Sequence, residues 1–113
     1  MSDVIGRLRA VCMAFPEVTE EPFGGHTSPC WRVRDKLFVM VNEAQTELNL
    51  KAPPGAQAVL VESNPERFFV PKYVGAKGWV GMRLDVALDW DEVEALAADS
   101  YRLIAPKRLA AMV

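Results

Sequence analysis

The sequence predicts an α+β fold of two layers, in which helices cover one face of an antiparallel sheet. Helical periodicity occurs near both ends of the chain, whereas short alternating or apolar runs, separated by turn residues, fill most of residues 30–84. The chain has 113 residues, half of them hydrophobic and a quarter charged, which suits one core. We expect a single domain over residues 1–113, ordered helix, three strands, helix, two strands, helix.

The first predicted helix begins at a cap formed by Ser2 and ends near Ala14, before Pro16. Apolar residues recur along it at helical spacing, at Val4, Leu8, Val11, Cys12 and Phe15. Residues 17–29 contain two prolines and two glycines and are predicted to form a polar loop.

Three predicted strands follow in series. Residues 30–34 alternate between apolar and basic side chains, and a tight turn leads into residues 37–41, so these segments form a hairpin. Residues 46–51 also alternate, which indicates one buried face and one wet face.

The second half of the chain begins with a short predicted helix over residues 56–62, whose Val59 and Leu60 can pack on the sheet. Two strands are expected at residues 68–70 and 79–84, joined by a basic loop that glycines punctuate. Asp89 and Glu92 have the spacing of a capping box and open the last helix, which Pro106 ends.

Several short segments, taken in their order and spacing, resemble the YjbR-like family, also called MmcQ/YjbR. They are residues 15–20 (FPEVTE), 22–24 (PFG), 31–33 (WRV), 36–38 (KLF), 73–80 (YVGAKGWV) and 100–101 (SY). The resemblance covers essentially the whole chain. It implies a two-layer fold similar to that of the type III secretion chaperones, and it carries a family label of DNA binding. It supplies no catalytic residue, cofactor or ligand.

The net charge of −2 argues against strong nonspecific attraction to phosphate backbones. Residues 30–88, however, hold eight bases and six acids, so the predicted sheet has a net charge of +2. If Trp31 and Val33 point inward, the basic residues between and after them point outward. The resulting candidate nucleic-acid contacts are Arg32, Arg34, Lys36, Lys72, Lys77, Trp79 and Arg83.

Two other interpretations stay open. Trp79 can instead be buried, under the loop of residues 17–29, which would leave the cations as ordinary solvated surface. Secretion chaperones of the similar fold dimerise and hold extended segments, so a protein interaction module that accepts a peptide at a sheet edge is the alternative function.

The sequence shows no catalytic signature. His26 is the only histidine, close to Glu20 and Glu21, and a structural role is favoured over one as general base. Cys12 and Cys30 lack metal-site spacing and are expected to be reduced. We therefore expect a cytoplasmic, monomeric protein that is not an enzyme, with no cofactor, metal or membrane segment.

Overall fold

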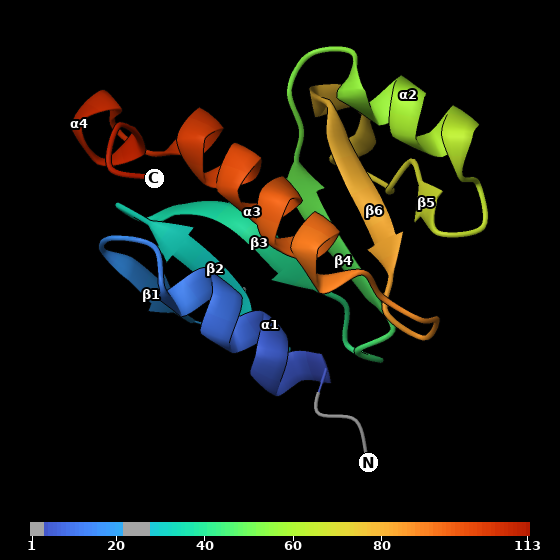
Figure 1. Ribbon diagram of the computed structural model, residues 1–113, viewed down its shortest axis with the longest axis horizontal. Helices are drawn as coiled ribbons and strands as arrows, with labels where there is room; N and C mark the ends of the chain where they lie inside the picture. The colour runs from blue at the N-terminus through green and yellow to red at the C-terminus, as the bar shows by residue number, and fades with distance from the viewer. Residues whose placement is uncertain (1–3, 22–27) are drawn as a thin grey trace.

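The computed structural model describes residues 4–21 and 28–113 and confirms the predicted α+β class. The described residues form one antiparallel sheet of six strands, in the order β1-β2-β3-β4-β6-β5. Helices pack against it (Figure 1). The strands are β1 (Val18–Glu20), β2 (Cys30–Val33), β3 (Lys36–Val41), β4 (Glu47–Lys51), β5 (Phe68–Phe69) and β6 (Trp79–Arg83). The helices are α1 (Val4–Met13), α2 (Ala56–Ser63), α3 (Trp90–Ile104) and α4 (Lys107–Ala110), with a 3₁₀ turn, η1 (Gly75–Lys77).

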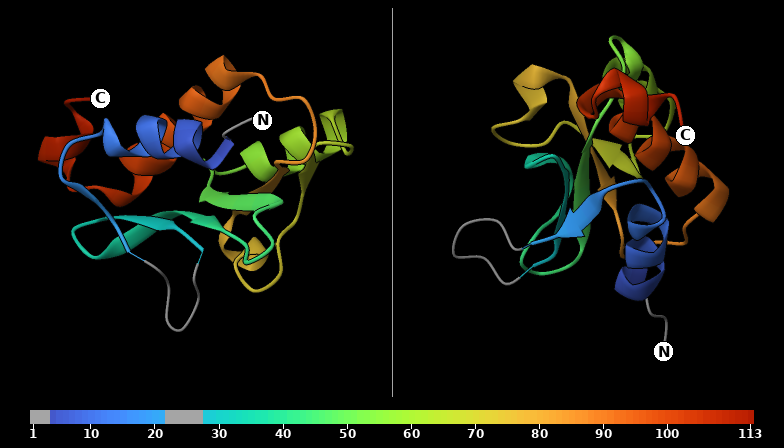
Figure 2. Two further views of the ribbon diagram at one scale, coloured as in Figure 1. Left: turned by 90° about the horizontal axis from the view of Figure 1, so that it is seen from below. Right: turned by 90° about the vertical axis from the view of Figure 1, so that its left-hand side faces the viewer.

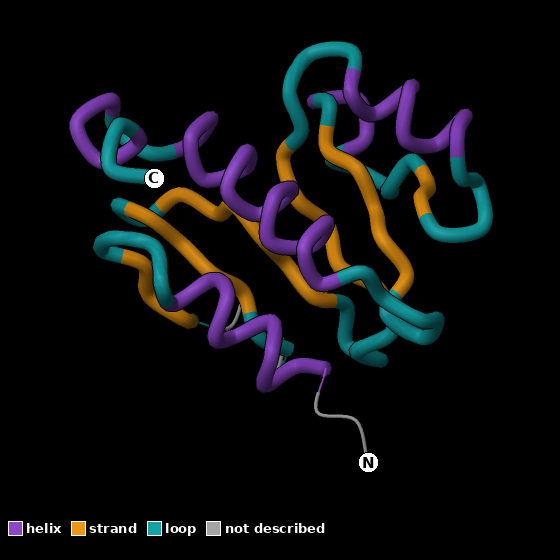
Figure 3. Tube along the Cα trace, viewed as in Figure 1, coloured by secondary structure: helices purple, strands orange, loops and turns teal. Residues whose placement is uncertain are grey.

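The two faces of the sheet differ. Helices α1 and α3 lie over one face, and the segment 70–78 lies on the other, as the left view of Figure 2 shows. We call the face turned away from α1 and α3 the outer face, and residues 70–78 the Tyr73 loop. Figure 3 shows how α3 runs across the middle of the sheet, where it contacts β3 and β4.

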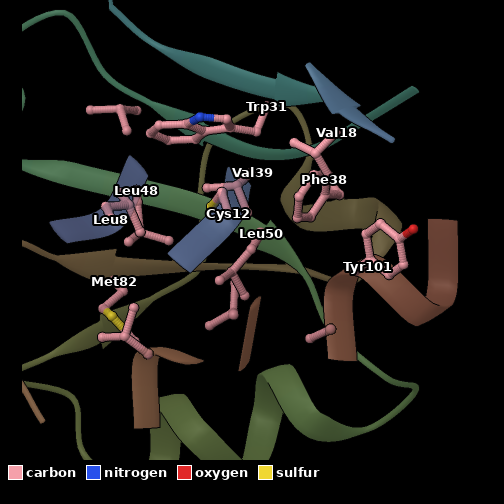
Figure 4. Close-up of a cluster of buried hydrophobic side chains, with 14 of the residues drawn as sticks. Leu8, Cys12, Val18, Trp31, Phe38, Val39, Leu48, Leu50, Met82 and Tyr101 are labelled. Atoms are coloured by element: carbon pink, nitrogen blue, oxygen red, sulfur yellow. The ribbon is translucent and has the colours of Figure 1, made fainter. Parts of the chain in front are cut away.

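The core lies between the sheet and the two long helices. Leu8 and Cys12 reach into it from α1, and Trp31, Leu48 and Leu50 reach into it from the strands (Figure 4). The parity predicted for β2 is confirmed, because Trp31 and Val33 are both fully buried. Cys12 and Cys30 are both buried and lie outside any disulfide bond.

Helix α3 supplies hydrogen bonds where the pairing between β3 and β4 ends, next to a bulge in β3. Phe38 is an extra residue between two β2–β3 pairs, Trp31↔Val39 and Arg32↔Leu37, and its ring packs edge-on against Tyr101. The carbonyl of Phe38 accepts a hydrogen bond of 2.6 Å from the Ser100 hydroxyl, whose oxygen accepts one of 3.0 Å from the Lys51 amide. Ser100 therefore connects β3 and β4 just beyond their last paired residues. It does not bond back to its own helix.

Several elements differ from the predicted ones. Strand β1 lies inside the predicted loop, where Val18 is buried and pairs with Val33, and η1 and α4 were also not predicted. Asp89 caps α3 as expected, but Glu92 pairs with Arg67. Val59 is 63% exposed, so the prediction that it packs on the sheet was wrong, whereas Leu60 does contact the core. The predicted cap Ser2 lies outside the described residues.

Candidate functional site

The seven predicted contact residues do not form one patch. Arg32 lies on the outer face of β2 and Arg83 on the outer face of β6, while Lys72 and Lys77 are exposed in the Tyr73 loop. Lys36 pairs with Val33, which faces the core, so it lies on the helical side of the sheet. There Lys36 lines a hollow of about 450 Å³ with Arg34, Lys107 and the chain between α3 and α4.

Arg34 is engaged in an ion pair. Its Nε donates to Glu17 Oε1 at 2.7 Å, and Arg108 approaches the other oxygen of the same carboxylate at 3.6 Å. The hydrogen bond from Arg34 is the main reason why the pKa of Glu17 lies below its ordinary value. Glu17 therefore neutralises part of the positive charge of Arg34 and Arg108. This cluster is distant from the Tyr73 loop in sequence and lies on the other side of the sheet.

Trp79 is 7% exposed, which contradicts the prediction of an exposed indole among cations. The alternative interpretation is confirmed in the burial of Trp79 but not in its cover by the loop of residues 17–29, since the elements that pack against β6 are α2 and η1. Both α2 and η1 pack against β6, and Gln57 of α2 donates a hydrogen bond of 2.6 Å to the carbonyl of Trp79. Trp79 is therefore part of the packed structure and offers no ring for stacking.

The exposed aromatic side chain of this region is Tyr73, which the sequence reasoning missed as a contact residue. Its side chain is 95% exposed, and its backbone has φ = 67°, a conformation that residues other than glycine rarely adopt. Lys72 precedes it and Lys77 follows in η1, so Tyr73 has the cationic neighbours that were assigned to Trp79. The available signal was a tyrosine in a predicted loop, preceded by Pro71 and Lys72 and followed by Val74.

The Tyr73 loop is fixed at several points, although it is exposed. The Gly75 amide donates to the Pro71 carbonyl at 3.0 Å, and the Lys77 amide donates to the Val74 carbonyl at 3.0 Å. Gln57 Nε2 also donates to the Gly75 carbonyl at 2.8 Å, and Lys51 Nζ donates to the Lys77 carbonyl at 2.7 Å. Because α2 and β4 hold this loop from two sides, Tyr73 stands on a supported turn.

Two roles considered from the sequence, an acidic partner for a general base and a metal site, gain no support from the described residues. Glu20 accepts hydrogen bonds from Arg9 and from the Trp31 indole, so its carboxylate connects α1 to the sheet. Within residues 4–21 and 28–113, no three histidine, cysteine or acidic side chains gather as a metal site would need. In the same residues, no helix is both long and apolar enough to cross a bilayer. His26 lies outside the described residues.

The fold is that of a small α+β protein whose antiparallel sheet has helices on one side and the Tyr73 loop on the other. The YjbR family model matches residues 13–103, and the chain belongs to this family. The resemblance found in the sequence is thereby confirmed, and the family assignment itself supplies no ligand.

Two solved structures share the fold. Protein DR2400 of Deinococcus radiodurans, described as having a DUF419 domain, is 21% identical with a TM-score of 0.79, over 88% of this chain and 77% of that chain. A protein from Pseudomonas syringae is 16% identical with a TM-score of 0.62, over 92% of this chain and 99% of that chain. At these identities the likeness shows the fold alone. No curated protein matches the sequence.

Proposed function

We propose that this protein binds single-stranded nucleic acid, DNA in the first instance, through the outer face of its sheet and the Tyr73 loop. The observation that carries the proposal is the Tyr73 ring, 95% exposed on a fixed turn beside Lys72. Proteins that bind single strands combine cations, which contact phosphates, with aromatic rings on which bases stack.

The charges around the ring fit this use. Lys51, Lys72, Lys77 and Arg83 lie on the outer face or in the loop, against the acids Glu43 and Glu47. The local balance is therefore positive, although the whole chain has a net charge of −2. A patch of this size neutralises few phosphates, so binding should be weak, with a Kd on the order of 1–100 µM near physiological salt.

The ring favours a single strand over a duplex. In a duplex the faces of the bases are stacked on one another and closed to a protein side chain, whereas an unpaired base can lie on a tyrosine. Tyr73 projects from a loop and belongs to no helix that could enter a major groove. We therefore expect single strands to bind more tightly than duplexes of equal length.

Fluorescence anisotropy with labelled single- and double-stranded ten-nucleotide DNA, at low and near-physiological salt, tests the proposal. Tyr73→Ala should weaken single-strand binding about tenfold, because stacking one base contributes ~1–3 kcal/mol. Lys72→Glu with Lys77→Glu should abolish most binding and lower the slope of log K against log salt by about 1.4, the value for two phosphates.

The matched control is Lys36→Glu with Lys107→Glu, which makes the same change in net charge on the helical side. This control should bind like the wild type apart from a small general effect of charge. If it loses as much affinity as the loop variant, binding depends on total charge and the outer face is not the interface. If the wild-type protein binds no oligonucleotide at low salt, the proposal fails, and isolation of a protein partner becomes the next experiment.

A further inference from the structure

A single row of side chains crosses the outer face next to the Tyr73 loop. The register places Cys30 opposite Met40, Met40 opposite Asn49, and Asn49 opposite Gly81, and Gly81 pairs in turn with Phe69. By parity these residues face away from the core, since Trp31, Leu48 and Met82 beside them are buried in it. Asn49 is the polar member of an otherwise apolar row.

Two hollows meet at this row, and both are lined by Asn49 and Tyr73. One has a volume of about 280 Å³ and is floored by Cys30 and Met40. The other has a volume of about 490 Å³ and is bounded by Phe69 and Lys72. Ligand sites generally combine apolar walls with a few polar groups. The first hollow has that composition, with Asn42 and Glu43 among its polar residues, whereas the second is more polar and includes Glu47.

The amide of Asn49 is unlike the other side-chain amides of the sheet region. Its Oδ1 is buried without a hydrogen-bond partner, and no hydrogen bond to either end of the amide occurs among the described residues. Asn42, by contrast, accepts from the amides of Thr46 and Glu47 and donates to the Thr46 hydroxyl. A buried amide oxygen without a hydrogen-bond partner costs stability, and leucine or methionine would avoid that cost at this half-buried position.

Two aromatic residues, Phe69 and Tyr73, line a hollow together with Asn49. The Phe69 ring covers Gly81, where a Cβ atom would lie 2.3 Å from its Cε2, so the ring occupies this place only because residue 81 is glycine. The guanidinium of Arg83 lies 5.5 Å from the centre of the same ring. Tyr73, in the loop, lines the same hollow as Phe69. A flat ligand can therefore meet a ring face while its edge reaches the Asn49 amide.

We propose that the hollows around Asn49 and Tyr73 are a pocket for one unpaired nucleobase, whose edge forms hydrogen bonds with the Asn49 amide. This inference rests on the proposed function and names the part of the ligand that the face recognises. Each of the four bases carries an acceptor on its pairing edge, to which the amide nitrogen of Asn49 can donate. Pairing in a duplex occupies that edge, so the pocket selects unpaired bases.

The test compares a labelled ten-nucleotide single strand with an abasic strand of equal length and charge. The wild type should bind the strand with bases at least tenfold more tightly than the abasic strand. Asn49→Leu should reduce this ratio about fivefold or more and leave the salt slope unchanged, because the substitution is neutral. Asn64→Leu, the same change at the end of α2, should keep the wild-type ratio.

Stability measurements on the same variants separate recognition from a structural role. Asn49→Leu should unfold at the same or a higher urea concentration than the wild type, because it removes a buried amide oxygen that lacks a hydrogen-bond partner. A clear loss of stability would show that Asn49 serves the fold and would overturn the inference. Tyr73→Leu, at an exposed position, gives a second variant that should also lower the ratio.

The outcomes distinguish the two proposals. Equal binding of both strands, with the expected salt dependence, would refute the base pocket and the stacking of a base on Tyr73, and would leave the outer face as a phosphate-binding surface alone. A wild-type ratio retained in Asn49→Leu would also refute it. Failure of the wild type to bind either strand would refute the proposed function and the pocket together.

Discussion

Ser100 is a buried hydroxyl that takes the place of a missing backbone pair between two strands. The carbonyl of Phe38 and the amide of Lys51 lie where the β3–β4 ladder would continue. The carbonyl accepts a hydrogen bond from the Ser100 hydroxyl, and the amide donates one to the Ser100 oxygen. Ser100 itself is fully buried, so water cannot replace it. The serine of the Ser100-Tyr101 pair in α3 therefore has a structural role, and this role does not depend on any catalysis.

We predict that Ser100→Ala lowers the free energy of unfolding by about 1–3 kcal/mol, because two buried backbone groups lose their partner. Urea denaturation followed by circular dichroism measures the change. Ser63→Ala, at the exposed end of α2, is the control and should stay within about 0.5 kcal/mol of the wild type. An effect at Ser100 no larger than at Ser63 would contradict this role.

Tyr101 predicts a dependence of stability on alkaline pH. Its buried ring donates a hydrogen bond of 2.6 Å from the hydroxyl to the Pro16 carbonyl, and burial is the main cause that raises its pKa above the ordinary value. A phenol with a raised pKa in the folded state stabilises the fold fully below about pH 10, its unfolded pKa, and this contribution is lost as the pH rises through the folded pKa.

Thermal denaturation at pH 8 and at pH 10–11 checks this prediction. The wild-type protein should lose more stability over this interval than Tyr101→Phe, which cannot ionise. Tyr73→Phe is the matched control, since Tyr73 is exposed, and it should keep the wild-type pH dependence. An identical alkaline loss in all three proteins would show that Tyr101 does not cause it.

The contrast between Trp79 and Tyr73 shows where residue-level prediction stops. Trp79 lies on the outer side of β6, but an outward side chain is exposed only if nothing packs over it. Packing of α2 and η1 against β6 decides this, and it depends on contacts distant in sequence. Tyr73 is exposed on a turn with a positive φ, which no local pattern of apolar residues encodes.

Among the elements, the regular strands were the most predictable. Alternation located β4, whose side chains are alternately buried and partly exposed, and β2, where the partly exposed Arg32 lies between the buried Trp31 and Val33. Strand β1 was missed because it has three residues next to a segment rich in proline and glycine, and it exists through pairing with β2. The bulge at Phe38 was hidden because residues 37–41 are continuously apolar.

Helix α3 gives a prediction at the scale of the element. Its cap, Asp89, accepts hydrogen bonds from the amides of Asp91 and Glu92. Asp89→Ala should therefore lower the free energy of unfolding by about 1 kcal/mol, whereas Asp89→Ser should restore most of it, because serine can also cap.

Chemical denaturation measures both variants, with Asp99→Ala as a control on the same helix. Asp99 forms an exposed pair with Arg102, and such pairs contribute little. Equal stability of Asp89→Ala and the wild type would mean that packing over β3 and β4, and not the cap, determines where α3 begins.

At the scale of the whole molecule, the helices and the core on one face leave the outer face to the Tyr73 loop and the row through Asn49. The sequence located the basic region in the sheet, but it could not separate Arg34 and Lys36 on the helical side from Lys72 and Lys77 in the loop. That separation arises from the bulge at Phe38, which puts Lys36 opposite the core-facing Val33. The candidate site therefore depends on tertiary structure more than the fold class does.

The measurement that tests the central claim most directly is a titration of the isotope-labelled protein with an unlabelled ten-nucleotide single strand, followed by amide chemical shifts. The outer face should respond: shifts should concentrate in residues 69–83 and at Cys30, Met40 and Asn49, while the amides of α1 and α3 stay unchanged. Shifts confined to α3, α4 and the Lys36 region, or no shifts at low salt, would contradict the claim that the outer face binds nucleic acid.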